Sequence, residues 1–326
     1  MDTGTHFVMG IALGGLATID PVVFNSAETT QAVFFATIIG SQIPDVDTVL
    51  KFKNNAAYIR NHRGITHSVP AVILWPIFLL AFLYPIFPES NVLHLWLWTS
   101  IAVFLHVFVD IFNAYGTQAL RPFSSKWVAL GWINTFDIFL FSILSFGGLL
   151  WLFGADPRDV FPAIFAAITA YYLLRYTVRK TIYETIKRRF PDAEKIILNP
   201  TFRFFRWRIA VITKEKFYVA RAYRREIYLL DEYKRLPLPD DPMMEVAKTD
   251  KNVAAFLSFS PVYRWEMEKE GDVTEIRFID LRYRSKHHYP FVAIVQLDDS
   301  LNILSSYTGW IYNVDKLKKK FETIPG

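Results

Sequence analysis

The stretch VLHLWLWTSIAVFLHVFVDIFN, residues 92 to 113, decides the fold of this chain. A membrane-spanning helix needs about 20 predominantly apolar residues, and this run has only three ionisable side chains, His94, His106 and Asp110. His106 and Asp110 are four residues apart, so a helix presents both on one face. The stretch therefore predicts a membrane helix with an ionisable pair near one end. Ionisable residues in such positions usually serve function.

The composition agrees with a membrane protein. Hydrophobic residues make up 52% of the 326-residue chain, aromatic residues 17%, and the mean hydropathy is +0.21. Cysteine is absent, which excludes disulfides and thiolate metal ligands. Any bound metal must use nitrogen and oxygen donors.

Further apolar segments flank this stretch. The clear ones cover residues 69–87, 92–113, 138–153 and 160–178, and two weaker ones cover 7–24 and 31–43. The first segment has no basic n-region and no Ala-x-Ala-like cleavage site, so we expect it to be retained. The sequence predicts an all-α polytopic membrane domain of about six helices over residues 1–185.

Charge divides the chain and sets its orientation. Residues 1–174 hold 7 Lys/Arg against 10 Asp/Glu, whereas residues 175–326 hold 29 against 21, and the change falls near residues 181–191. The short turns 88–91 and 154–159 carry a single basic residue, Arg158, while the opposite helix ends carry many. The positive-inside rule places those ends in the cytoplasm, in a multi-pass protein of the cell membrane.

The region 190–326 has a different pattern. Residues 203–212, 216–223, 273–283 and 289–297 alternate aromatic and polar side chains, and turn residues follow at 270–272 and 298–302. We expect a small antiparallel β-rich cytoplasmic domain here. Its positive charge can attract anionic lipid headgroups, an acidic protein partner or nucleic acid; headgroups are the simplest choice and nucleic acid is the least favoured.

Candidate metal ligands gather at one end of the predicted helices. This set comprises His6, Asp45, Asp47, His62, His67, His106 and Asp110. Imidazole and carboxylate are common ligands of Zn²⁺ and similar ions. For His106 and Asp110 alone, a carboxylate that orients a structural histidine is an equally good interpretation.

The two loop peptides each leave an alternative open. In residues 61–68, NHRGITHS, a turn at Gly64 can bring His62 and His67 together, although the peptide can also be a basic juxtamembrane loop. In IPDVD, Pro44 favours a helix break, after which Asp45 is a candidate bridging ligand. A capping or surface role fits Asp47 nearly as well.

Together these residues carry a family resemblance. The fragments are Thr5-His6, Pro44-Asp45-x-Asp47, His62-Arg-Gly-x-Thr-His67-Ser, His106-x-x-x-Asp110, Pro122-Phe-Ser124 and the later Asp137. This pattern over about residues 1–155 resembles the YdjM family of bacterial inner-membrane metal-dependent hydrolases, also labelled LexA-binding, and the whole chain is similar to its YfhP branch. That family is grouped with the zinc-dependent phospholipase C and P1 nuclease fold.

The resemblance implies phosphoester hydrolysis. It implies metal ligation by His6, Asp45, His62 or His67, His106 and Asp110. The mature N-terminal Trp of the secreted relatives and their later His and HxxxE/D set are missing, so we expect one or two divalent ions, with Zn²⁺ as the first choice.

Three further side chains are candidates for catalysis. Asp47 or Asp137 can act as base, and Arg63 can hold a phosphate oxygen of a phospholipid-type or other phosphoester substrate. Arg63 fits a topology charge at least as well, and Asp137 fits a carboxylate at a helix N-terminus.

Three functions follow from this pattern. A membrane metal-dependent phosphoesterase leads. A regulatory protein with a structural metal site, which binds a cytoplasmic partner through residues 190–326, is second. A metal or proton transporter is third, because the ionisable residues gather at one face instead of crossing the membrane.

Overall fold

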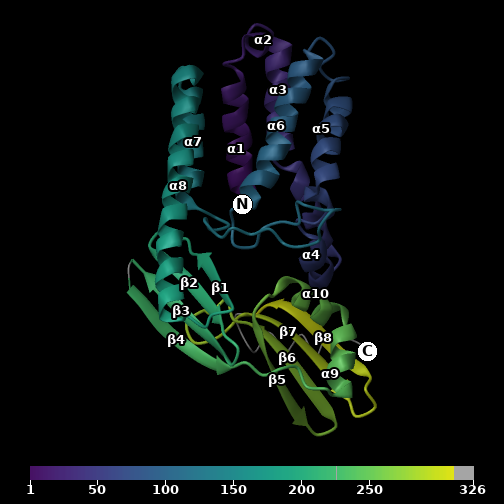
Figure 1. Ribbon diagram of the computed structural model, residues 1–326. Coiled ribbons are helices and arrows are strands. Elements are labelled where there is room, and N and C mark those ends of the chain that lie inside the picture. The colour runs from purple at the N-terminus through teal and green to yellow at the C-terminus, as the bar shows by residue number, and fades with distance from the viewer. Residues whose placement is uncertain (225, 312–326) are drawn as a thin grey trace. The chain divides into compact units, whose positions relative to one another are not determined.

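The computed structural model describes residues 1–224 and 226–311, which form two compact units. The helical unit comprises Met1–Thr48, His62–Thr181 and Pro200–Phe204. The β-rich unit comprises Val49–Asn61, Ile182–Asn199 and the chain from Phe205 onward. The predicted helical domain followed by a β-rich domain is thus confirmed (Figure 1).

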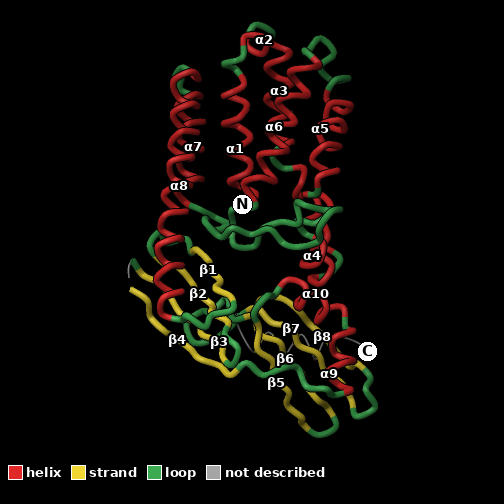
Figure 2. Tube along the Cα trace, in the orientation of Figure 1, coloured by secondary structure: helices red, strands yellow, loops and turns green. Residues whose placement is uncertain are grey.

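Helices dominate the first unit (Figure 2). They are α1 (Thr3–Ala17), α2 (Pro21–Phe24), α3 (Ala27–Gly40), η1 (Ile43–Phe52), η2 (Ile65–His67), α5 (Val69–Leu83), α6 (Val92–Asp110), α7 (Ile138–Leu152) and α8 (Pro157–Arg189). The end of η1 from Val49 and the end of α8 from Ile182 belong to the β-rich unit. Each of the six predicted segments overlaps one of the long helices α1, α3, α5, α6, α7 or α8. Helices α1, α3 and α8 begin three or four residues before the predicted starts, and α8 continues to Arg189, past the predicted end at residue 178. At the start of α5, the Ser68 hydroxyl accepts a hydrogen bond from the Ala71 amide and so caps the helix.

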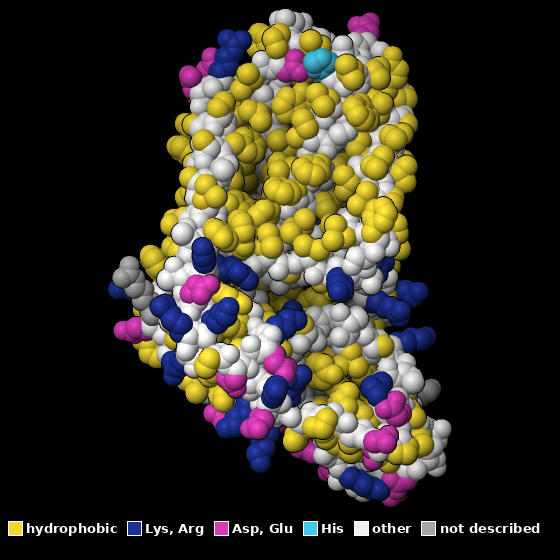
Figure 3. Space-filling model, viewed as in Figure 1, with side chains coloured by type: hydrophobic (Ala, Val, Ile, Leu, Met, Phe, Trp, Pro, Cys, Tyr) yellow, Lys and Arg dark blue, Asp and Glu magenta, His cyan; other side chains and the backbone are white. Residues whose placement is uncertain are grey.

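Two helices of the described chain, α6 and α8, are long and apolar enough to cross a membrane. Two pairs of consecutive helices also meet this requirement when each pair is taken together, although each is bent at a short break: α3 with η1, and Asn55–His67 with α5. Helices α1 and α7 are apolar but shorter. Hydrophobic side chains cover the visible face of these helices (Figure 3). A surface of this kind is stable only in an apolar solvent such as the bilayer core.

Small residues bring α1, α3 and α6 into close contact. A Cβ on Gly10 of α1 would lie 2.8 Å from the Ile38 Cα of α3, and a Cβ on Gly40 of α3 would lie 3.1 Å from the Ala102 Cβ of α6. Close backbone approach through small residues is a usual packing mode of membrane helices. It places the ends of α1 and α6 beside the chain that leaves α3.

The β-rich unit contains two four-stranded sheets. The first has the order β1 (Lys195–Pro200), β2 (Arg206–Ile212), β3 (Lys216–Tyr223) and β4 (Glu226–Lys234). The second has the order β5 (Tyr263–Glu270), β6 (Val273–Asp280), β7 (Phe291–Asp298) and β8 (Ile303–Trp310). Strands β2 to β4 and β5 to β8 pair antiparallel, so the predicted strands and turns are confirmed.

Two helices, α9 (Pro242–Thr249) and α10 (Lys251–Phe259), precede the second sheet and were not predicted. The sheets meet through an apolar cluster, in which Ile212 and Phe217 of the first sheet share a core with Val262 and Leu281.

A polar contact reinforces the junction between the two sheets. Tyr289 donates a hydrogen bond of 2.6 Å to the carboxylate of Asp231, and Arg284 forms an ion pair with the same group. Burial opposes ionisation of Asp231, but these two partners hold its pKa below the usual range.

A segment from the middle of the helical domain's sequence folds with the β-rich unit. Helix α4 (Asn55–Asn61) packs against α10 and β8. The side-chain amide of Asn55 donates a hydrogen bond of 3.0 Å to the Thr308 carbonyl. The next residue, Gly309, has φ +146°, and a Cβ there would lie 2.7 Å from the Tyr307 hydroxyl oxygen and 2.9 Å from Asn55 Nδ2. This backbone conformation favours glycine, and the two side chains leave little room for a Cβ.

Replacing Gly309 by alanine should therefore destabilise the β-rich unit by about 1–3 kcal/mol, because the substitution combines a disfavoured φ with displacement of Asn55. The measurement is the thermal unfolding of the purified full-length protein. The matched control is Gly271→Ala, since Gly271 has φ +61° but nothing within 4 Å of an added Cβ. Equal losses in the two variants would show that the Asn55 contact contributes nothing.

Candidate metal centre

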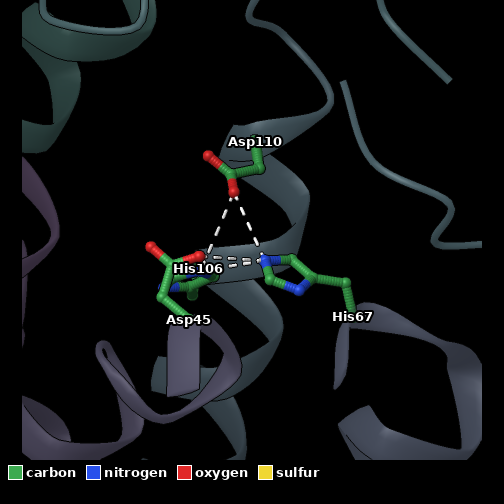
Figure 4. A group of neighbouring side chains, drawn as sticks. All are labelled: Asp45, His67, His106 and Asp110. Atoms are coloured by element: carbon green, nitrogen blue, oxygen red, sulfur yellow. Dashed lines mark hydrogen bonds and ion pairs between the residues drawn. The ribbon is translucent and has the colours of Figure 1, made fainter. Parts of the chain in front are cut away.

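Four side chains from three parts of the helical unit converge on one point (Figure 4). Asp45 comes from η1, His67 from η2, and His106 and Asp110 from the last turns of α6. One donor atom of each lies within 4.8 Å of the others. His67, His106 and Asp110 are fully buried, and Asp45 is 11% exposed. The structure thus brings four of the seven candidate ligands into one group.

The two histidines direct the same nitrogen at this point. His106 Nδ1 lies 2.7 Å from the Ser41 carbonyl, which can only accept, so Nδ1 carries the proton. The Thr66 hydroxyl donates to Asp47 and lies 3.1 Å from His67 Nδ1, which makes that nitrogen the donor as well. Both Nε2 atoms then present lone pairs, only 3.3 Å apart. Two lone pairs repel at this distance unless a cation lies between them.

The spacing of the four donors fits a divalent ion. His67 Nε2 lies 3.5 Å from carboxylate oxygens of both Asp45 and Asp110, and His106 Nε2 lies 3.7 Å from the same two oxygens. Ligands about 2.0–2.2 Å from one tetrahedral ion stand about 3.3–3.6 Å apart. These two oxygens, Asp45 Oδ1 and Asp110 Oδ2, are buried and accept no regular hydrogen bond from the described residues, although Arg63 Nε lies 3.2 Å from Asp110 Oδ2. Buried carboxylate oxygens without such a hydrogen bond are suitable donors for a cation.

A second group of three adjoins the first and shares Asp45 with it. Its other members are Asp47 and His62, whose Nδ1 lies 2.7 Å from the Asp47 carboxylate. Asp47 also accepts hydrogen bonds from the Arg63 amide at 2.8 Å and the Thr66 hydroxyl at 2.7 Å. This second group is more accessible, because the His62 side chain is 20% exposed.

His6 and Arg63 surround Asp110 on its other sides. His6 Nε2 lies 3.3 Å from Asp110 Oδ1, and its ring stacks on His106 with centroids 3.7 Å apart. Arg63 Nε lies 3.2 Å from Asp110 Oδ2, and its Nη2 donates a 2.6 Å hydrogen bond to the Met1 carbonyl. The Met1 amino group also contacts Asp110. Both residues therefore lie beside the four-residue group, although His6 belongs to neither donor group found in the described residues, and Arg63 is buried against the Asp110 carboxylate.

Asp137 has a different environment. Its carboxylate caps α7 through the Phe139 and Leu140 amides and accepts a 2.8 Å hydrogen bond from the Tyr171 hydroxyl. It is in neither of the two groups found among the described residues. These contacts agree with the alternative interpretation from the sequence, in which Asp137 is a carboxylate at a helix N-terminus.

The sequence pattern can now be compared with known proteins. The family model described as YdjM inner membrane protein matches residues 1–182. The chain belongs to the YdjM family. The YfhP middle domain matches residues 191–233, and the YfhP C-terminal alpha/beta plait domain matches residues 242–321.

One relative in this family covers the whole chain. It is described as "Uncharacterized protein YfhP" of Bacillus subtilis (strain 168), and is 55% identical over 323 residues, or 99% of each chain. No solved structure matches. The resemblance to the YdjM family is confirmed, and the chain is a membrane protein of that family.

The groups that support the ligands were not predicted from the sequence of this YdjM-family member. The Ser41 carbonyl and the Thr66 hydroxyl set the histidine tautomers, and Asn113 holds the chain after α6 by accepting from the Tyr115 and Gly116 amides. The role of a backbone carbonyl cannot be predicted from the identity of its residue. Thr66 precedes His67 directly in the NHRGITHS motif, and this position was the only sequence feature that could have indicated its contact with the histidine.

Thr66→Val should weaken Zn²⁺ binding about 10–100-fold, because loss of an outer-shell partner frees the His67 ring and leaves Asp47 with one donor fewer. The measurement is competition with a chromophoric chelator in detergent solution.

Two further variants serve as controls for Thr66→Val. Thr66→Ser keeps the hydroxyl and should restore the affinity. Thr177→Val removes a hydroxyl that bonds only the Leu173 carbonyl within α8 and should change nothing. Wild-type affinity in Thr66→Val would refute the proposed support.

Proposed function

We propose that this protein is an integral-membrane, metal-dependent hydrolase that cleaves phosphoester bonds with metal-activated water. The observation that carries the proposal is the buried approach of His67 Nε2 and His106 Nε2 to 3.3 Å, with two carboxylate oxygens 3.5–3.7 Å away. The nitrogen and oxygen donor set and the four-fold grouping favour Zn²⁺.

Two adjoining groups support a centre of up to two ions. Asp45 belongs to both, and a shared carboxylate is a natural bridge between metals. The first group has four protein donors and is closed. The second offers three donors, and three protein ligands with an accessible side are the pattern of a catalytic zinc site. We therefore assign substrate binding to the side of Asp47 and His62.

A bound divalent ion would supply Lewis-acid polarisation of the phosphoryl oxygen and lower the pKa of a bound water. The chain's own residues orient the site. Asp47 accepts three hydrogen bonds, which leave about one of its roughly four lone-pair sites for an ion, and it holds the His62 ring in place. His62 then presents its other nitrogen at the accessible side as ligand or proton acceptor. Arg63 offsets the negative charge of Asp110.

A regulatory membrane protein with a structural metal site is the second candidate. It is favoured by the closed, four-donor character of the first group, in which three side chains are fully buried. Structural zinc sites have this arrangement. The site and the β-rich unit would face the cytoplasm in either case, as the charge distribution predicts.

The test measures metal content and the hydrolysis of a chromogenic phosphodiester and of phospholipid by detergent-purified protein. We expect His106→Ala to lose both metal and turnover, because it removes a buried donor. His62→Ala should lose turnover at least about 10²-fold while keeping the ion of the closed group, as expected for a proton-transfer or open-site residue.

The control is His94→Ala. His94 contacts Asp20 in the same unit and belongs to neither donor group found in the described residues, so both quantities should stay unchanged. Stoichiometric metal without turnover on any phosphoester would favour the regulatory candidate. A folded wild type without metal would refute both.

A further inference from the structure

The loop between α6 and α7 contains a segment that is held in a defined conformation. Thr117 and Val128 exchange two backbone hydrogen bonds, of 3.1 and 2.9 Å. Between them, the Gln118 side chain donates a 2.7 Å hydrogen bond to the Ser125 carbonyl, and the Ser124 amide donates to the Leu120 carbonyl at 3.1 Å. We call residues 117–128 the interfacial loop. These hydrogen bonds fix the backbone that carries the outward-facing side chains of the loop.

The tip of the interfacial loop is apolar and exposed. Phe123 is 86% exposed and Leu120 is 50% exposed, and Pro122 between them is exposed as well. Ile65 of η2, on the neighbouring loop of the same unit, is 68% exposed. A single exposed apolar side chain is common on protein surfaces. A loop with a fixed backbone that exposes a Leu, a Pro and a Phe within four residues instead indicates a surface that contacts an apolar partner.

Cations flank this apolar tip. Arg121 lies beside Phe123 in the chain, and Lys126 is exposed just after it. The whole connection from residue 111 to 136 contains no Asp or Glu. Neither cation forms an ion pair with a carboxylate in the described part of the chain. Their charge is therefore available to an anionic partner.

The position of the loop within the helical unit identifies that partner. The Arg121 carbonyl accepts a hydrogen bond from the Val69 amide, the first residue of the apolar helix α5. The Gln118 amide and the Thr117 hydroxyl donate to the Arg63 carbonyl, at 2.9 and 3.1 Å. The loop thus lies at the ends of the apolar helices and beside the candidate metal centre. Helix ends of this kind meet the membrane–water boundary.

We propose that the interfacial loop inserts Leu120 and Phe123 at the boundary between headgroups and acyl chains of the adjacent leaflet, while Arg121 and Lys126 bind the phosphates of anionic lipids. Apolar side chains interleaved with basic ones are the pattern by which segments lie in the plane of a bilayer. Each basic residue near the surface adds electrostatic attraction to anionic lipid. An acidic protein surface would match the cations but not the apolar tip.

The proposal stands apart from the proposed hydrolase activity. It rests on the loop alone and would hold for a regulatory protein too. If the protein is a hydrolase, the same loop brings lipid phosphates to the side of the helical unit where the candidate metal centre lies.

The natural absence of cysteine allows a direct test in the full-length protein. Ser125→Cys places a single thiol on the exposed loop without removing Phe123, and an environment-sensitive nitrobenzoxadiazole probe is attached to it. The protein is reconstituted into phosphatidylcholine vesicles with and without phosphatidylglycerol. We expect blue-shifted emission, strong quenching by a lipid with a nitroxide at the top of its acyl chain, and weak quenching by aqueous iodide.

The reference is the same probe at Asp272→Cys, in the exposed turn between β5 and β6. If the two probes show the same emission and the same quenching, the proposal is refuted. Phe123→Ser and Leu120→Ser together, in the Ser125→Cys background, should lower the lipid quenching; both side chains are largely exposed, so folding should be retained. Unchanged quenching in that variant would also refute the insertion.

The role of the cations is tested separately. Phosphatidylglycerol should increase lipid quenching of the Ser125 probe, and Arg121→Gln with Lys126→Gln should abolish that increase. If an acidic protein were the partner, quenching would not depend on phosphatidylglycerol, and the lipid-phosphate part of the proposal would fall.

Discussion

The centre of the helical unit depends on two imidazole nitrogens held 3.3 Å apart inside the protein. His67 and His106 both have their protons on the outer nitrogen, so the facing atoms carry lone pairs. Carboxylate oxygens from two other positions approach the same point and find no hydrogen there. Four electron-rich atoms in one buried volume repel each other strongly. A divalent cation removes this repulsion and turns it into coordination, which is why we regard the centre as a metal site.

The tight packing of α1, α3 and α6 makes this convergence possible. Gly10 and Gly40 lie where helices approach so closely that a Cβ would collide or be crowded. Because α6 carries two donors and η1 follows α3, any increase in the distance between these helices would separate Asp45 from His106. The glycines therefore determine ligand geometry although they bear no donor.

The chain between the two ligand-bearing loops has an unexpected place. Asp47 precedes α4 and His62 follows it, yet α4 folds with the β-rich unit through Asn55 and Thr308. Asp47 and His62, two donors of the helical unit, are therefore connected in the chain through α4, which is part of the β-rich unit.

The sequence by itself determined the helical and β-rich domains, because hydrophobic length and strand alternation are local properties of the chain. It also supplied seven candidate donors, among them His106 and Asp110 from their four-residue spacing, and Asp45 and His67 from their positions at helix ends. Only the tertiary structure decided which donors share one point, which carbonyl fixes the His106 tautomer and that Asp137 caps α7 instead. Only the tertiary structure showed that α4 belongs to the β-rich unit and that α9 and α10 are present. These features depend on contacts between residues distant in the chain, and no local pattern records them.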